Sequence, residues 1–177
     1  LRAISAVYVW LIRGTPMLVQ AFFVFYAIPQ LVKVMTGTAF TLTPFAAGAI
    51  TLSLNAGAYI SEIFRGGIQA VPRGQTEAAR SLGLSSAKTM LRVVLPQAFK
   101  IAIPSLVNQF IITVKDTSIL SVIGLAEVVN RAKQYVGSTY SFFATYVYVG
   151  ALYLVVISLL MVLSRRIEKR MSYDRKG

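Results

Sequence analysis

The sequence predicts an all-α fold, a polytopic bundle of membrane helices with about four spans. Two observations predict it: long apolar stretches without a charge, and a strong imbalance between basic and acidic residues. Of the 177 residues, 56% are hydrophobic and 14% are charged, whereas about 25% of the residues in a soluble domain are charged. Lys and Arg number 18 against 6 Asp and Glu, which gives a net charge of +12. Such a composition suits a lipid bilayer or nucleic acid as the partner.

The positions of the charges favour the bilayer. Runs without a charged residue cover residues 14–32, 34–61 and 134–164, and a shorter run covers 101–114. A membrane-spanning helix needs about 20 mostly apolar residues, and its backbone groups must be satisfied internally. We therefore predict a single domain over residues 1–177, with spans at 16–33, 43–64, 97–116 and 142–164. The third span is the weakest, since it contains Pro104, Asn108 and Gln109.

The basic residues predict how the chain is oriented. Four spans put both ends of the chain and the 65–100 loop on one side, and this side carries 14 of the 18 basic residues. The positive-inside rule assigns that side to the cytoplasm. Its basic residues are Arg2, Arg13, Arg65, Arg73, Arg80, Lys88, Arg92, Lys100, Arg165, Arg166, Lys169, Arg170, Arg175 and Lys176, whereas Lys33, Lys115, Arg131 and Lys133 lie outside.

The stretch 3–12 is too short to span, and its apolar residues recur at helical spacing, which predicts an interfacial helix or a segment that follows an earlier span. The sequence contains no Cys and no His. We therefore expect no disulfide, no catalytic residue of the Cys or His kind and no metal site of the usual ligands.

The loop 65–97 has helical punctuation of its own. Helix formers over 75–82 predict a first short helix, and Gly83 follows at the position where a left-handed residue ends a helix. Ser85 or Ser86 suits the N-cap of a second helix over 87–95, which Pro96 is expected to end. We also expect an i,i+3 pair between Glu77 and Arg80. On this basis alone, a docking element and a solvated connector are both open.

A spaced motif in this loop resembles a known family. Glu77, Ala78 and Ala79, then Gly83 after three residues, then Val93, Leu95 and Pro96 are similar to the EAA loop of ABC importer permeases. The only departure is Val93, where the family pattern has Ile. The segments 13–16, 52–55, 58–63, 65–68 and 115–118 resemble the polar amino-acid branch of these permeases. Members of this branch usually have five spans, so we expect that this chain lacks the first span.

The resemblance implies a type I ABC importer permease, a transmembrane subunit that is not itself an enzyme. It implies a cytoplasmic ATPase subunit, a second permease subunit that is identical or different, and an extracytoplasmic amino-acid-binding protein that is separate or fused. It also implies a bacterial inner membrane as the location, with the loop and the tail in the cytoplasm. ATP and Mg²⁺ are used by the ATPase, and no cofactor by this chain. The coupling residues would be Glu77, Ala78, Ala79, Arg80, Ser81, Gly83, Leu95 and Pro96.

Polar residues within the predicted spans are candidates for the substrate path, since such residues usually face a bundle interior or a pathway. On the second span, Asn55, Tyr59 and Glu62 lie at i, i+4 and i+7, on one helical face. On the third span the candidates are Ser105, Asn108, Gln109 and Asp116. The ammonium of an amino acid needs an acceptor such as Asp116 or Glu62, and its carboxylate needs donors such as Asn55 or Gln109.

Each candidate also has a structural explanation. Asn55, Asn108 and Gln109 are equally suited to hydrogen bonds between helices, each worth under about 2 kcal/mol. An ion pair with Arg65 is the preferred explanation of Glu62. Lys115 and Asp116 can pair with each other's neighbours at the outer interface or hold the loop that follows them. Gln20 on the first span is a weaker candidate for the substrate path.

Two other functions compete with the importer. An ion-gradient-driven secondary transporter or channel would carry more buried acids and broken helices, and it would not need the EAA spacing. A nucleic-acid-binding protein would carry its basic residues on a soluble surface with interleaved aromatic residues. Neither explains the loop, and we expect no nucleic-acid partner.

Overall fold

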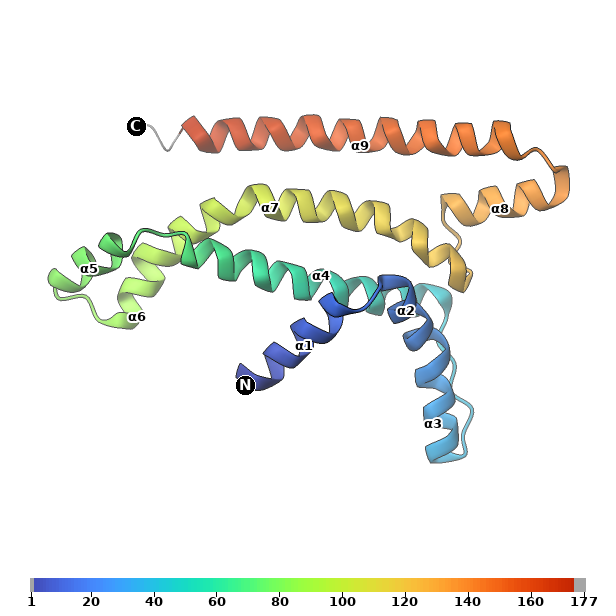
Figure 1. The fold of residues 1–177 in the computed structure, drawn as a ribbon, viewed down its shortest axis with the longest axis horizontal. Coiled ribbons are helices and arrows are strands. Elements are labelled where there is room, and N and C mark those ends of the chain that lie inside the picture. Colours follow the sequence, from blue (N-terminus) through green and yellow to red (C-terminus); the bar gives the residue numbers. More distant parts are fainter. Residues whose placement is uncertain (1, 174–177) are drawn as a thin grey trace. The chain divides into compact units, whose positions relative to one another are not determined.

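The computed structural model describes residues 2–173. Arg175 and Lys176 of the basic tail lie outside this range, as do the side chains of Lys169 and Arg170. Every regular element within residues 2–173 is a helix (Figure 1), as the sequence predicts. In chain order they are α1 (Arg2–Gly14), α2 (Met17–Phe22), η1 (Phe23–Ala27), α3 (Ile28–Thr36), α4 (Pro44–Gln69), α5 (Arg73–Ser81), α6 (Ser86–Thr89), η2 (Met90–Val94), α7 (Leu95–Asp116), η3 (Thr117–Ile123), α8 (Val128–Thr139) and α9 (Phe142–Tyr173).

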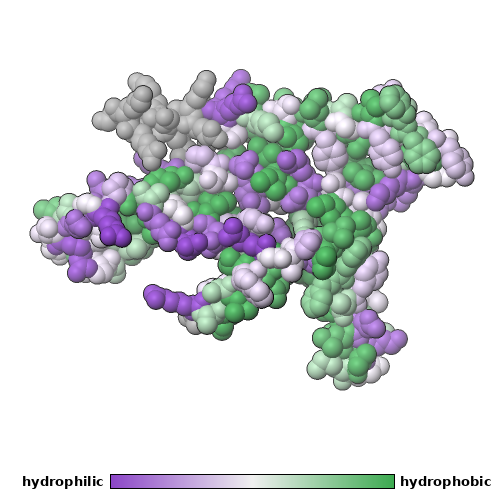
Figure 2. All heavy atoms as spheres, viewed as in Figure 1, coloured by the Kyte–Doolittle hydropathy of each residue, from purple (hydrophilic) through white to green (hydrophobic). Residues whose placement is uncertain are grey.

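Three continuous helical segments of the described chain are long and apolar enough to cross a membrane: Met17–Thr36, Ser86–Ile123 and Phe142–Arg166. On the face seen in Figure 2, apolar residues gather over α9 and over the α2–α3 segment. A surface of this kind suits contact with lipid.

Helix α4, which covers the predicted span 43–64, is not one of these three segments. Its 26 residues give a length of about 39 Å, enough to cross a bilayer. Its mean hydropathy is lowered by small and polar residues such as Gly48, Thr51 and Asn55. Small residues of this kind favour close packing of a helix against other helices. That α4 spans the membrane stays a prediction.

Two segments of the described chain are π-helical, and each ends two residues before a proline. In η1 the amide of Ile28 donates to the Phe23 carbonyl, and in η2 the amide of Leu95 donates to the Met90 carbonyl, both from i to i−5. Pro29 and Pro96 follow, and neither has an N–H to donate to the carbonyl four residues earlier. The wider turn is one way in which a helix adapts to that missing bond.

The prediction that Pro96 ends the second helix of the loop is therefore wrong. The chain stays helical from Ser86 through η2 into α7, and Pro96 is the second residue of α7. Proline is tolerated in the first turn of an α-helix, and the π-helical residues before it supply the change of register that allows the helix to continue.

The chain divides into two compact units: Leu1–Ala58 with Ile111–Leu160, and Tyr59–Phe110 with Met161–Gly177. The core of the first unit joins α2, η1, α4 and η3. It consists of Ala21, Val24, Ala47, Leu120 and Ile123. Gly48 permits this packing, because a Cβ there would lie 2.9 Å from Cδ1 of Leu120.

Helix α1 also belongs to the first unit and contacts α4. The Tyr8 hydroxyl donates to the Leu54 carbonyl over 2.6 Å, and a Cβ at Gly57 would lie 3.0 Å from that hydroxyl. A helix at residues 3–12 is thus confirmed, whereas its interfacial position stays a prediction. Its exposed apolar residues are Ile4, Val7, Trp10 and Leu11.

The second unit has a smaller core under the predicted coupling loop. Val71, Val94 and Ala98 are its buried members. Close to this core, α4 and α7 approach each other at Gly67, where a Cβ would lie 2.8 Å from the Ala98 carbonyl oxygen and 3.3 Å from the Ala102 Cβ. This crossing therefore depends on the absence of a side chain at residue 67.

Candidate functional site

The first helix of the loop, α5, is defined by its two ends. Pro72, with φ −57° and ψ 133°, is the N-cap residue, and its ring prevents α4 from continuing. At the other end, the Gly83 amide donates to the Arg80 carbonyl over 3.0 Å and the Leu84 amide to the Ala79 carbonyl over 3.2 Å. This pair of bonds is a Schellman motif. Gly83 has φ +83°, which confirms the predicted left-handed stop.

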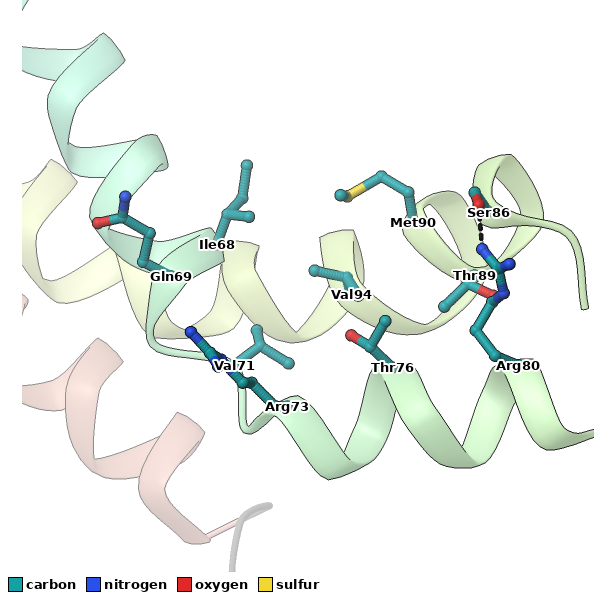
Figure 3. A pocket seen from close by; sticks show the side chains of 10 residues that line it. All are labelled: Ile68, Gln69, Val71, Arg73, Thr76, Arg80, Ser86, Thr89, Met90 and Val94. Atoms are coloured by element: carbon teal, nitrogen blue, oxygen red, sulfur yellow. Dashed lines mark hydrogen bonds between the residues drawn. The ribbon is translucent and has the colours of Figure 1, made fainter.

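The second helix begins at a serine cap. The Ser85 side chain accepts a hydrogen bond from the Lys88 amide, one of the two N-caps that the sequence predicts. The predicted pair between Glu77 and Arg80 is replaced by a different contact, because the Arg80 guanidinium donates to the Ser86 hydroxyl (Figure 3). This bond joins α5 to the start of α6 and closes the turn between them.

The predicted coupling residues differ in their exposure. Ala79 is buried on the side of α5 that packs in the loop. The exposed ones are Glu77, Ala78, Arg80, Ser81 and Gly83 on α5 and its end, and Leu95 and Pro96 at the start of α7. Glu77, Ala78 and Ser81 lie within about 100° of one another around the helix axis, at 100° per residue. The small exposed side chains leave room for another protein to approach the α5 backbone.

The candidate Asn55 is bound to another polar side chain within the first unit. It is buried, and its Nδ2 donates to Oε1 of Gln20 over 3.0 Å. The Gln20 amide donates in turn to the Ile12 carbonyl over 2.7 Å and to the Thr15 carbonyl over 3.0 Å. The observed contacts support the structural explanation, in which Asn55 links α4 to α2 and, through Gln20, to the end of α1.

The candidate Glu62 is paired with Arg65. Nε of the Arg65 guanidinium donates to Oε1 of Glu62 over 2.9 Å, and a second nitrogen donates to Oε2. The hydrogen bond, and then the charge of the carboxylate, raise the pKa of Arg65 above its ordinary value. The ion pair that the sequence favours is thus present, one turn before the end of α4.

The remaining candidates lie on α4 and α7. Tyr59 on α4 is half-buried, and on α7 Gln109 is buried while Ser105 and Asn108 are exposed. Asp116 is the last residue of α7 and is partly buried beside the exposed Lys115. Asn55 and Asp116 belong to the first unit, and the other candidates to the second. Their role in a substrate path stays a prediction.

Helix α8 is an element that the sequence analysis missed. Glu127 caps it with both carboxylate oxygens, which accept from the amides of Val129 over 2.8 Å and Asn130 over 2.6 Å. The Tyr153 hydroxyl on α9 lies 3.5 Å from the same carboxylate. The sequence does contain a signal for this helix: Glu127 is followed by Val128, Ala132 and Val136 at helical spacing. These residues lie in the region that the charge pattern assigns to an outer loop.

These features define a class: a helical membrane protein with a spaced EAA motif that begins on the short helix α5 and ends in the first turn of the long helix α7. Comparison identifies the family. Residues 1–173 match the binding-protein-dependent transport system inner membrane component family. The chain belongs to this family.

Relatives of known name carry the same assignment. The chain is 42% identical to the L-cystine transport system permease protein TcyB of Bacillus subtilis (strain 168), over 97% of this chain and 70% of TcyB. It is 38% identical to the arginine transport system permease protein ArtQ of the same organism, over 95% of this chain and 74% of ArtQ. It is 36% identical to the glutamine transport system permease protein GlnP of Escherichia coli (strain K12), over 95% of this chain and 74% of GlnP.

A solved structure agrees with these sequence relatives. One chain of the crystal structure of an amino acid ABC transporter with histidines superposes with a TM-score of 0.88 at 38% identity, covering 95% of this chain and 75% of that one. The chain is therefore a membrane-embedded permease subunit of an ABC importer, a transport component and not a catalytic one. The alternative of a secondary transporter is set aside.

Proposed function

We propose that this permease imports a polar amino acid and that residues 65–97 couple it to a cytoplasmic ATPase. The observation that carries the coupling proposal is the geometry of α5. Its Schellman end, its serine-capped successor and the Arg80–Ser86 bond make a rigid projection with small exposed side chains. A rigid projection transmits movement of a bound partner to the helices that it joins, α4 and α7.

The substrate class rests on the relatives. The three named above carry cystine, arginine and glutamine in their names, and the similar crystal structure contains histidines. All four of these molecules are polar amino acids. In this proposal a second permease subunit and an extracytoplasmic binding protein complete the importer, the ATPase binds ATP and Mg²⁺, and this chain binds no cofactor. The basic loop and tail face the cytoplasm.

The coupling proposal is tested by reconstitution in vesicles with the ATPase and the binding protein. Loaded binding protein should stimulate ATP hydrolysis and uptake in the wild type. Glu77→Lys should lower uptake at least ten-fold and weaken ATPase binding, because it reverses a charge on the exposed face of α5. Lys88→Glu is the matched control, since it reverses an exposed charge on the neighbouring α6. Normal uptake by Glu77→Lys would reject the coupling role.

The pathway proposal concerns Asn55 and Asp116 and needs two readouts. If Asp116 binds the substrate ammonium, Asp116→Ala should raise the KM for uptake several-fold while the ATPase stays bound. If Asn55 also contacts substrate, Asn55→Ala should raise KM more than Gln20→Ala does, although both break the same hydrogen bond. Equal effects of these two variants on KM and on thermal stability would assign Asn55 to packing alone.

A further inference from the structure

The second unit contains a cavity behind α5 that shares Arg80 and Ser86 with the proposed coupling loop. It has a volume of about 590 Å³ and lies between the end of α4, α5 and the α6–η2 segment (Figure 3). Pockets that bind small molecules have volumes of about 300–1,000 Å³. The cavity therefore has room for a ligand considerably larger than a bare ion.

One part of the lining offers hydrogen-bond donors and positive charge. Arg73 and Arg80 line it together with the hydroxyls of Thr76, Ser86 and Thr89, and no acidic residue is among the lining residues. Arg80 donates to Ser86, and a guanidinium has five N–H donors, so further donors of Arg80 can serve a ligand. Guanidinium groups match phosphate oxygens in geometry and charge. The lining thus selects an anion.

Thr89 gives an independent indication of a polar ligand. Its side chain is 2% exposed, and within the described part of the chain its Oγ1 is buried with no hydrogen-bond partner. A buried hydroxyl without a partner costs stability. The Oγ1 of Thr89 is shielded from solvent, but Thr89 lines the cavity and Thr has two accessible χ1 rotamers in a helix, so the hydroxyl can turn to donate to an acceptor oxygen bound there.

The other part of the lining is apolar and limits the kind of anion. It consists of Ile68, Val71, Met90 and Val94. Inorganic phosphate has no apolar part to cover such a wall. A ligand that carries a phosphate at one end and hydrocarbon at the other uses both parts of the lining.

The cavity residues of α5 lie on a face next to the one that carries Glu77, Ala78 and Ser81. Arg73, Thr76 and Arg80 are spaced i, i+3 and i+7 and so share a face, whereas Glu77 and Ser81 do not line the cavity. We therefore expect a ligand in the cavity to lie beside a protein that contacts Ala78 and Ser81, and not beneath it.

We propose that this cavity binds the phosphate headgroup of an anionic phospholipid, with Arg73 and Arg80 on the phosphate and the apolar wall against the start of the acyl chains. The inference rests on the proposed function in one respect: it needs the loop to lie at the cytoplasmic leaflet, where anionic headgroups attract basic residues.

The test measures lipid retention by the full permease assembled with its ATPase. Complexes in phosphatidylcholine nanodiscs receive increasing amounts of phosphatidylglycerol, and native mass spectrometry counts the phosphatidylglycerol retained. We expect saturable retention that Arg73→Gln weakens about five-fold or more. Thr89→Val, which keeps the side-chain shape and removes the hydroxyl, should also weaken retention. Lys88→Gln is the matched control, because Lys88 is exposed and does not line the cavity.

Three outcomes would overturn the proposal. Equal retention by Arg73→Gln and Lys88→Gln would show that general surface charge attracts the lipid. Displacement of phosphatidylglycerol by inorganic phosphate at equal concentration would assign the cavity to the free anion. Release of the ATPase by Arg73→Gln with unchanged lipid retention would assign it to the protein partner. Uptake is measured on the same complexes, so a failure of coupling is distinguished from a failure of lipid binding.

Discussion

Gly67 permits a close approach between α4 and α7 in the second unit. Replacing it by Ala would bring a Cβ to within 2.8 Å of the Ala98 carbonyl oxygen, and a backbone atom cannot turn aside as a side chain can. We expect Gly67→Ala to destabilise the protein by about 1–3 kcal/mol, the usual cost of overpacking. Thermal unfolding of the purified permease in detergent measures this loss.

The neighbouring glycine supplies the control. A Cβ at Gly66 would meet nothing within 4 Å, and alanine favours a helix over glycine by about 1 kcal/mol. Gly66→Ala should therefore leave the midpoint temperature of thermal unfolding unchanged or raise it slightly. Equal midpoints for Gly66→Ala and Gly67→Ala would contradict the close crossing.

For single residues, the sequence predicts the kind of side chain and its place on a helix face better than it predicts which residue that side chain contacts. Periodicity put Asn55 on one face of a helix, but it left open whether Asn55 contacts substrate or another helix. The bond to Gln20 depends on α2 and α4 meeting 35 residues apart, which local spacing does not encode. The Glu62–Arg65 pair was predictable because both residues lie within one turn.

The helix α8 shows how a single carboxylate can define an element. Both oxygens of Glu127 accept amide hydrogen bonds at its first turn, and substitution of an N-cap by Ala costs about 1 kcal/mol. We expect Glu127→Ala to accelerate hydrogen exchange at the amides of Val129 and Asn130 about five-fold, with little change elsewhere. Hydrogen exchange measured by mass spectrometry detects this local opening.

The variant Tyr153→Phe distinguishes the effect of the Glu127 cap on α8 from the effect of the contact between Glu127 and α9. It removes the hydroxyl that lies 3.5 Å from Glu127 but leaves both cap bonds intact. Exchange at Val129 and Asn130 should then stay near that of the wild type. If both variants opened α8 alike, the contact with Tyr153 would be what stabilises it.

The elements themselves were predicted unevenly. The stop at Gly83 and the cap at Ser85 were predictable, because each depends on one residue and its nearest neighbours. The continuation through Pro96 was not, because it depends on a π-helical turn before the proline that no residue pattern announces. The same holds for η1 before Pro29.

For the whole molecule, the orientation of the chain is the most direct prediction of the charge pattern. The sequence contains no cysteine, so single cysteines can be labelled without a background. We expect a membrane-impermeant maleimide to label Ser138→Cys, on the exposed surface of α8, in intact cells. Lys88→Cys, exposed on α6, should be labelled only after the membrane is permeabilised.

The two labels control each other, since each must react fully with the reagent in detergent. Labelling of Lys88→Cys in intact cells would reverse the orientation that 14 basic residues on one side predict. It would also remove the coupling loop from the compartment in which ATP is available.

The fold class and the family of the whole chain were accessible from the sequence, because both depend on composition, charge-free runs and one spaced motif. The cavity was not accessible. It forms only where Arg73, Thr76 and Arg80 on α5 come opposite Ser86 and Thr89, and that placement requires the exact turn between the two helices.

The π-helical turn η2 also makes the length of this segment critical. A chain that loses one residue between Met90 and Val94 would lose the wide turn, although no span would be lost, and an α-helical turn in its place would set the Pro96 ring against the carbonyl four residues earlier. The helix would then kink or break between α6 and α7. Ser86 and Thr89 would leave the cavity, and Arg80 would lose its partner. Single-residue deletions here should thus be far more damaging than their small effect on hydropathy suggests.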